Sequence, residues 1–294
     1  MINIYVIGCG GIGGYLLELL PMSIASLNID MSGRAEQLLI ADGMAPAPSV
    51  VDRLTLIDGD VFDQRNAIRQ ASGNSTGSKV AGRLEQFLAY AQLEGRNKGL
   101  LSTWLSAMEV AGVGKYVTPD TISQIIPREP KKNMVNANLL DSEGGSLLLN
   151  NICKRGLQDA AVVFLCVDND KTRLEVAKYM ETFDTCLLVS GGNTKTTGNV
   201  LVYERSLGEE LDPPIYEMFD NIAHPKDKRP DERSCTAVAP KHDQVANTNC
   251  MIATWMSVVF SRWVREGLDD KDGRINEVLI DTDNYAVDGV RHLR

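Results

Sequence analysis

The chain has 294 residues, of which 44% are apolar and 23% are charged. This composition is typical of one large or two smaller globular domains, and it excludes a disordered chain, a coiled coil and a disulfide scaffold. Acidic residues outnumber basic residues by 39 to 30, which gives a formal net charge of −9. Because negative charge repels phosphate backbones and anionic lipid, we expect neither nucleic-acid nor membrane partners.

The cysteines and histidines do not have the spacing of a metal site or a disulfide framework. The six cysteines contain no Cys-x-x-Cys pair, and only three histidines are present, so we expect free thiols, no zinc and a cytoplasmic location. Cys9, Cys166, Cys186 and Cys250 lie in apolar segments and are expected to be buried. The first 29 residues carry one charge, but five glycines and a proline among them argue against a signal peptide or a membrane span.

Short apolar runs alternate with segments of helical periodicity along the chain. The expected strands are residues 2–7, 54–57, 161–167, 186–189, 199–203 and 277–280. The expected helices are residues 12–20, 80–91, 100–110, 171–182 and a long helix that contains residues 252–263. Strands that alternate with helices predict a Rossmann-like, doubly wound α/β fold, in which helices cover both faces of a mainly parallel sheet.

Three stretches interrupt this alternation. Residues 21–52 contain glycines and prolines and are expected to be an insertion with little regular structure. Residues 95–155 form a second enlarged stretch, in which the prolines that follow the helix at 100–110 argue against regular structure. Residues 205–234 contain four prolines and many charges and are expected to form a mobile crossover loop.

Residues 8–13 (Gly-Cys-Gly-Gly-Ile-Gly) lie between an expected strand and an expected helix. Glycine allows the backbone to turn tightly and to approach phosphates, which bind to the free N–H groups of a helix N-terminus. This context indicates a nucleotide site, although the motif does not by itself distinguish NAD from FAD or ATP. The alternative is a glycine turn that only packs the helix on the sheet.

Polar residues follow the expected strand at 54–57. Asp58 ends this strand in the position of an acid that holds a ribose, or else it only opens a turn. Five further polar residues follow by position 79, namely Asp60, Asn66, Arg69, Gln70 and Lys79. Converging cations suit a triphosphate and its departing pyrophosphate better than a nicotinamide cofactor. The alternative is a solvated loop with ordinary surface charges.

Asp168 and Asn169 follow the expected strand at 161–167, at the edge of the sheet where open α/β folds bind ligands. The Asp168 carboxylate would hold Mg²⁺ against phosphate oxygens, or it would cap the helix that begins near Lys171. The two roles are compatible with each other.

Five blocks follow one another in a fixed order. They are residues 7–13 (Ile-Gly-Cys-Gly-Gly-Ile-Gly), 54–60 (Leu-Thr-Leu-Ile-Asp-Gly-Asp), 65–70 (Arg-Asn-Ala-Ile-Arg-Gln), Lys79 and 167–169 (Val-Asp-Asn). In this order they resemble the ThiF/MoeB/HesA family of ubiquitin-activating-enzyme-like adenylyltransferases, and the Asn-x-x-Arg-Gln block is far more specific than the glycine loop. The chain looks most like the ThiF-type proteins of plasmid- and phage-borne PRTRC gene systems.

The resemblance implies an enzyme that uses ATP to adenylate the C-terminal glycine of a small ubiquitin-like or sulfur-carrier protein and releases pyrophosphate. Its implied nucleotide-binding residues are Gly8, Gly10, Gly11, Gly13, Asp58, Asp60, Asn66, Arg69, Gln70, Lys79 and Asn169. Arg69, Lys79 and Asp168 would be catalytic, with Asp168 as the Mg²⁺ ligand, and a homodimer is left open. Residues 1–204 would form the adenylation domain, and residues 205–294 would add the crossover loop, a long helix and a final strand to the same domain.

Cys235 follows the charged loop and is the candidate acceptor of the activated carrier as a thioester. Arg233 and Lys241 lie nearby in the sequence and would favour the thiolate; the alternative is an unreactive residue that enters the last helix. Two rival functions remain. One is an NAD- or FAD-dependent oxidoreductase that uses the same glycine loop, and the other is a non-catalytic ATP-binding scaffold in a plasmid or phage complex.

Overall fold

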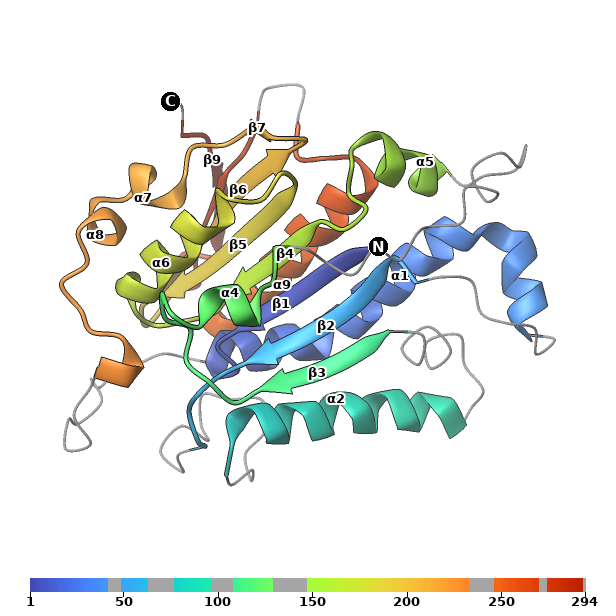
Figure 1. Cartoon of the computed structure of the whole chain (residues 1–294), viewed down its shortest axis with the longest axis horizontal. Coiled ribbons are helices and arrows are strands. Elements are labelled where there is room, and N and C mark those ends of the chain that lie inside the picture. The colour runs from blue at the N-terminus through green and yellow to red at the C-terminus, as the bar shows by residue number, and fades with distance from the viewer. Residues whose placement is uncertain are drawn as a thin grey trace.

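A single sheet organises the molecule, which is known from a computed structural model that describes residues 1–41, 49–62, 77–96, 108–128, 147–232, 246–269 and 274–292. Within these residues, nine strands form one sheet in the order β3-β2-β1-β4-β5-β6-β8-β9, and β7 pairs with β6 (Figure 1). The strands are β1 (Ile2–Ile7), β2 (Val51–Ile57), β3 (Glu109–Val113), β4 (Ala161–Leu165), β5 (Cys186–Asn193), β6 (Thr197–Ser206), β7 (Glu209–Glu210), β8 (Glu277–Asp281) and β9 (Ala286–Val290).

Helices cover both faces of the sheet because its central strands are apolar on both sides. In β1, Ile2, Ile4 and Val6 pack into one buried cluster, and Tyr5 and Ile7 pack into another. The first cluster includes α1 (Gly11–Ala41), α2 (Lys79–Arg96), α5 (Leu147–Lys154) and α9 (Ala246–Arg265), and the second includes α4 (Ile122–Ile125) and α6 (Asp170–Met180). The predicted doubly wound α/β fold is therefore confirmed.

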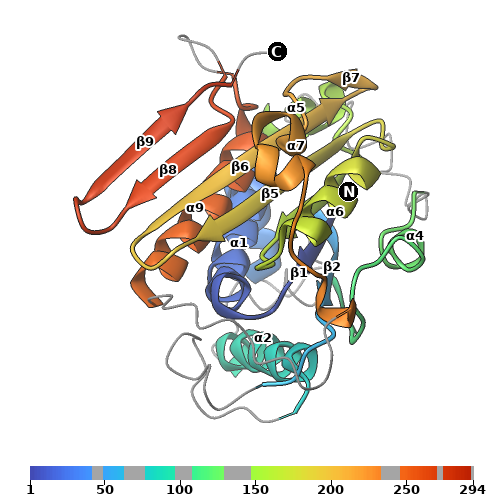
Figure 2. The same cartoon turned by 90° about the vertical axis from the view of Figure 1, so that its left-hand side faces the viewer.

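The sheet has a parallel half and an antiparallel half. Strands β1 to β5 are parallel, and β1 lies between β2 and β4, so that Ile7 is in register with both Ile57 and Leu165. The carboxyl ends of these three strands consequently meet at one edge. Strands β6, β8 and β9 run antiparallel to their neighbours, and the β8–β9 hairpin forms the outer edge seen in Figure 2.

The expectation of little regular structure in residues 21–52 is wrong for residues 21–41. Helix α1 continues through Pro21 to Ala41, and its residues Leu20, Ile24 and Leu27 are buried in extensive contact with α9. A proline removes one hydrogen bond, and here the packing of the apolar face offsets that loss. The segment Gly11–Asp30 is long and apolar enough to cross a membrane, but more than half of it is buried inside the protein, as in a core helix.

The helix expected at 100–110 is wrong at its C-terminal end. Residues 109–113 form β3, which pairs in parallel with β2, and the remainder of the expected helix lies mostly outside the described residues. The short strand Glu-Val-Ala-Gly-Val is half-buried at the sheet edge, so its sequence has no long apolar run. The sequence prediction also missed β9 (Ala-Val-Asp-Gly-Val), which pairs with β8 in a hairpin, because this strand too has no long apolar run.

A cluster of buried charges joins the antiparallel half to the helices. The Arg274 guanidinium contacts the carboxylates of Glu204 in β6 and Asp212, with Nε 2.7 Å from the Asp212 carboxylate. The side chains of Glu204 and Asp212 are 2% and 1% exposed. Arg155 adds a second cation 3.3 Å from Glu204 and lies over the ring of Trp263 in α9. Charges buried this deeply are stable only while their partners remain.

We therefore expect Arg274→Met to lower the free energy of unfolding by about 3–5 kcal/mol, because the two carboxylates would stay buried without this cation. Urea denaturation at pH 7 measures the change. Arg265→Met is the matched control, since Arg265 pairs with Asp30 at the surface and such pairs contribute less than about 1 kcal/mol. Equal losses in both variants would show that the cluster has no special role.

Candidate functional site

The turn after β1 brings the backbone closer to β4 than any side chain would allow. Gly8 has φ +91°, and a Cβ atom there would lie 2.6 Å from the carbonyl oxygen of Cys166. A Cβ atom on Gly13, in the first turn of α1, would lie 1.9 Å from the carbonyl oxygen of Gly8. Only glycine therefore fits at this position as well. The glycine loop is thus required by the packing, and the same turn leaves the N-terminus of α1 at the carboxyl edge of the sheet.

Asp58 fixes the glycine loop from the side of β2. Its carboxylate accepts hydrogen bonds from the N–H groups of Cys9 and Asp60, at 2.7 and 2.8 Å. Burial raises the pKa of Asp58, whereas these two N–H groups and the nearby Lys79 favour the ionised form. Asp58 therefore does open a turn, and it also lines the cavity described below.

Lys79, the first residue of α2, lies between two carboxylates. Its Nζ is 2.9 Å from Asp60 and 4.0 Å from Asp58. Burial by itself lowers the pKa of Lys79, but the charges of Asp58 and Asp60 outweigh it and raise the pKa, so the amine is an ammonium at neutral pH. Tyr116 donates a hydrogen bond of 2.7 Å to the other oxygen of Asp60. With three donors, the ammonium keeps capacity for a further anion.

The N-terminus of α6 is occupied by the protein's own side chains. Asn169 accepts a hydrogen bond from the N–H of Thr172, and the Asp227 carboxylate accepts from the N–H groups of Asp170 and Lys171, at 2.6 and 3.1 Å. Asn169 is therefore the cap, and the alternative of a cap at Asp168 is wrong. A phosphate is not expected at this helix end.

At the N-terminus of α1, in contrast, no described side chain accepts a hydrogen bond from the N–H groups of Gly10 and Gly11. The hydrogen bond from the N–H of Gly14 to the carbonyl of Gly10 is the first of the helix, so the N–H groups of the preceding turn have no helical acceptor. The first turn of α1 contains no acidic residue. Between the N-termini of α1 and α6, that of α1 is the one that can accept an anion.

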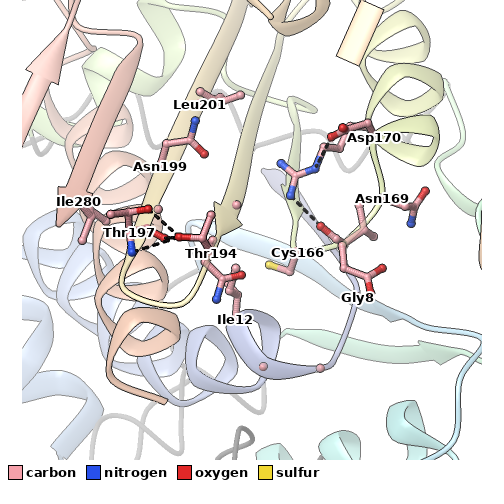
Figure 3. Close-up of a pocket in the computed structure, with 18 of the residues that line it drawn as sticks. Gly8, Ile12, Cys166, Asn169, Asp170, Thr194, Thr197, Asn199, Leu201 and Ile280 are labelled. Carbon is pink, nitrogen blue, oxygen red and sulfur yellow. Dashed lines mark hydrogen bonds and ion pairs between the residues drawn. The ribbon is translucent and has the colours of Figure 1, made fainter. Parts of the chain in front are cut away.

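These elements surround one cavity of about 980 Å³. One end is formed by the glycine loop, Asp58, Lys79 and the start of α6, and the other by β6 and the β8–β9 hairpin. In Figure 3, Gly8 and Asn169 lie at one end, and Thr197 and Asn199 lie at the other. Asn169 is 1% exposed, and its Nδ2 has no hydrogen-bond partner among the described residues. Buried donors without partners are uncommon in folded proteins, and this one belongs to a residue that lines the cavity.

The charges around the cavity are mainly negative. Among the described residues its lining contains the acidic side chains of Asp58, Asp60, Asp168, Asp170, Asp281 and Asp288, and the basic side chains of Lys79 and Arg173. No group of three or more His, Cys, Asp or Glu side chains in the described residues would hold a metal ion alone. Mg²⁺ usually takes one or two carboxylates together with substrate phosphates, and exposed Asp168 fits this donor set.

The structure brings most of the described sequence-predicted residues together. Those that line the cavity are Gly8, Gly10, Gly11, Asp58, Asp60, Lys79, Asp168 and Asn169. Gly13 is buried behind Gly8. The remaining four, Asn66, Arg69, Gln70 and Cys235, lie outside the described residues, and their roles stay predictions.

Arg173 and Tyr116 are among the residues that organise the site and that sequence reasoning missed. Arg173 is buried and donates to Ser190 and to the backbone carbonyls of Val167 and Gly191, which ties α6 to the carboxyl ends of β4 and β5. The only signal for Arg173 in the sequence is its position four residues after Asn169. Tyr116 follows β3, an element that sequence reasoning did not identify, and gave no signal at all.

Comparisons with known proteins agree with this architecture. No protein-family profile matches the sequence, and no curated protein matches it. The fold is similar to the crystal structure of PaaA, with a TM-score of 0.52 and 12% identity, over 99% of this chain and 64% of that one. It is also similar to E. coli MccB with ATP, with a TM-score of 0.52 and 15% identity, over 99% and 64%. MccB with AMPCPP and MccA gives a TM-score of 0.53 and 14% identity, over 99% and 64%. The chain thus spans about 64% of the length of these proteins.

The cysteines differ in their exposure to solvent, which the sequence did not predict. Cys9 and Cys186 are buried as expected, and Cys166 is only partly buried, at the cavity. Cys250 is exposed, which makes its expected burial wrong: it lies on the outward face of α9 with Thr254. Burial raises the pKa of Cys166 and of Cys186 to about 12.

We expect iodoacetamide at pH 8 to modify Cys250 in the native protein much faster than Cys9, Cys166 or Cys186. A thiol with a pKa near 12 is a thiolate in only about one molecule in 10⁴ at this pH. Peptide mapping by mass spectrometry measures the order, and denatured protein serves as the control in which all four react. Modification of Cys186 at the rate of Cys250 would contradict the prediction.

Proposed function

We propose that this chain is an ATP-dependent adenylyltransferase. The observation that carries the proposal is the convergence of the α1 N-terminus, Asp58, Lys79 and Asp168 on one cavity. This arrangement offers N–H groups and an ammonium to phosphates, a carboxylate to a ribose and a second carboxylate to a cation that accompanies the phosphates. Fold neighbours solved with ATP and with AMPCPP support the choice of nucleotide.

The acyl substrate is proposed to be the C-terminal carboxylate of a peptide or small protein. The cavity continues beyond the glycine loop over β6, β8 and β9, where Thr197, Asn199, Leu279 and Asp288 line it. This second half leaves room for a chain beside the nucleotide. MccB has been solved together with AMPCPP and MccA, and also with N-formylated MccA, which supports a second partner in such a fold. The sequence resemblance narrows the proposal to a ubiquitin-like or sulfur-carrier protein that ends in glycine.

In the proposed reaction, a carboxylate oxygen of the substrate attacks the α-phosphorus of ATP. The bond between the α-phosphorus and the bridging oxygen breaks, and pyrophosphate leaves with the electron pair, so that the products are an acyl adenylate and pyrophosphate. A carboxylate is ionised at neutral pH and needs no general base. The protein therefore contributes positioning and charge neutralisation, through the α1 N–H groups and Lys79. Mg²⁺ held by Asp168 would stabilise charge on the phosphate oxygens.

Three narrower proposals rest on the sequence. Asn66, Arg69 and Gln70 would complete the triphosphate site, Cys235 would accept the carrier as a thioester, and two copies of the chain would form a homodimer. All four of these residues lie outside the described part of the chain. The likeness to PRTRC-system proteins likewise stays a prediction.

Mg-ATP is expected to raise the melting temperature more than NAD or FAD at equal concentration, because only a triphosphate matches the N–H groups, the ammonium and Asp168 together. At 100 times Kd the stabilisation is about 2.7 kcal/mol, or about 5 °C for a chain of this size. Differential scanning fluorimetry measures the shift, with AMP as the control that lacks the outer phosphates.

A larger shift with NAD or FAD would contradict the adenylation proposal and favour the oxidoreductase. ATP–pyrophosphate exchange in the presence of a synthetic peptide that ends in Gly-Gly tests the reaction itself. Tight binding of ATP without exchange, with the peptide or any carrier encoded beside the gene, would favour the non-catalytic scaffold.

Asp168→Ala is expected to leave the fold intact and to remove the effect of Mg²⁺ on ATP binding. Asn169 and Asp227 supply the α6 cap, and Asp168 is an exposed carboxylate whose charge acts on Lys79, so the free energy of unfolding should change by less than about 1 kcal/mol. Calorimetric titration with ATP, in Mg²⁺ and in EDTA, measures the effect. Asp120→Ala is the control, because Asp120 is an exposed carboxylate outside the cavity. An undiminished Mg²⁺ effect in Asp168→Ala would exclude Asp168 as the ligand.

A further inference from the structure

Arg83 is a buried arginine that no part of the proposed reaction uses so far. It lies on α2, one turn after Lys79, and it is 1% exposed. Its Nε donates to the carbonyl of Cys9 at 3.2 Å, and its Nη2 lies 3.5 Å from the carbonyl of Gly10. Nη1 donates to Gln86 at 2.8 Å. An arginine is buried this completely only when its donors have partners, and here two of those partners are carbonyls of the glycine loop.

These contacts determine where the N–H groups of the loop point. In a trans peptide the C=O and the N–H lie on opposite sides, and no cis peptide occurs among the described residues. The carbonyls of Cys9 and Gly10 face Arg83, so the N–H groups of Gly10 and Gly11, which belong to the same two peptide units, face away from it. Gly10 and Gly11 line the cavity, whereas Arg83 is not among its described lining residues.

The guanidinium of Arg83 is closely packed against the start of α1. A Cβ atom on Gly14, in the first turn of α1, would come within 2.3 Å of Nη2. The guanidinium also lies over the ring of Phe62, 5.4 Å from the centroid. Burial lowers the pKa of Arg83, but an arginine remains protonated at neutral pH. A fixed positive charge therefore lies directly behind the N-terminus of α1.

We propose that Arg83 is a positioning residue for the phosphates of the nucleotide. It holds the carbonyl side of the glycine loop, so that the N–H groups of Gly10 and Gly11 are presented to the cavity, while Asp58 holds the N–H of Cys9 from the β2 side. Arg83 acts through the loop and does not touch the ligand. The inference rests on the proposed nucleotide-binding function and adds to it a residue on the far side of the loop.

The test compares ATP with adenosine, which has the same nucleoside but no phosphates. Calorimetric titration is performed on the wild type, Arg83→Met and Arg83→Lys. We expect the affinity of Arg83→Met for ATP to fall by about 10- to 100-fold, the equivalent of one charge-assisted hydrogen bond, and its affinity for adenosine to change by less than about twofold. Arg83→Lys keeps the charge but lacks the planar fork that reaches two carbonyls, so it should lie between the other two.

Gly14→Ala provides a second route to the same result, because its Cβ displaces the guanidinium and leaves every charge in place. It should weaken ATP selectively, as Arg83→Met does, and it decides the question if Arg83→Met does not fold. Arg53→Met is the matched control: it removes an arginine from an exposed pair with Glu109 in β3 and should bind ATP like the wild type.

Two outcomes would overturn the inference while leaving the proposed function in place. One is unchanged ATP affinity in both Arg83→Met and Gly14→Ala, and the other is an equal loss of ATP and adenosine affinity, which would mean that Arg83 only supports the fold. A wild-type protein that does not bind ATP at all would instead reject the proposed function, and the inference with it.

Discussion

The close approach of the backbone at Gly8 to the end of β4 is the constraint on which the site depends. A side chain at this position would collide with the carbonyl of Cys166, so the chain can turn from β1 into α1 only through glycine. The turn places the N-terminus of α1 between the carboxyl ends of β2 and β4. Asp58 at the end of β2 and Asp168 beyond the end of β4 are then brought to the same cavity.

The N-termini of α1 and α6, which both lie at this edge of the sheet, have different surroundings. At the N-terminus of α6, the Asn169 side chain and the Asp227 carboxylate accept hydrogen bonds from the backbone N–H groups. The N-terminus of α1 has no acidic residue in its first turn, and Arg83 lies behind it. Because a helix N-terminus attracts anions, this difference leaves α1 as the end that a phosphate would occupy. Asp227 comes from the segment after α8 (Asp220–Ala223), so this segment is held against the site by the same interaction.

The antiparallel half of the sheet extends the cavity beyond the glycine loop. Residues Thr197, Asn199 and Leu279 lie on one face of β6 and β8, because cross-strand pairs share a face. This half is joined to the parallel half by the pairing of β6 with β5, and the cluster of Glu204, Asp212 and Arg274 adds buried ion pairs to that attachment. Because a buried ion pair is costly to break, these contacts stabilise the position of β6 beside the cavity.

The sequence by itself determined the doubly wound fold, the glycine loop and the identity of Asp58, Lys79 and Asp168 as neighbours, since β-branched runs, helical periodicity and glycine spacing are local signals. It failed for α1 beyond Pro21, for β3 and for Cys250, where the outcome depends on which partner covers a segment. Only the tertiary structure decided that Asn169 and not Asp168 caps α6, that Asp227 fills that helix end, and that Arg83 holds the glycine loop. The contacts of Asp227 and Arg83 join residues that are far apart in the chain, and no local pattern records a hydrogen bond between a side chain and a distant backbone group. The Asn169 cap joins neighbours in the chain, but the sequence did not distinguish it from a cap at Asp168.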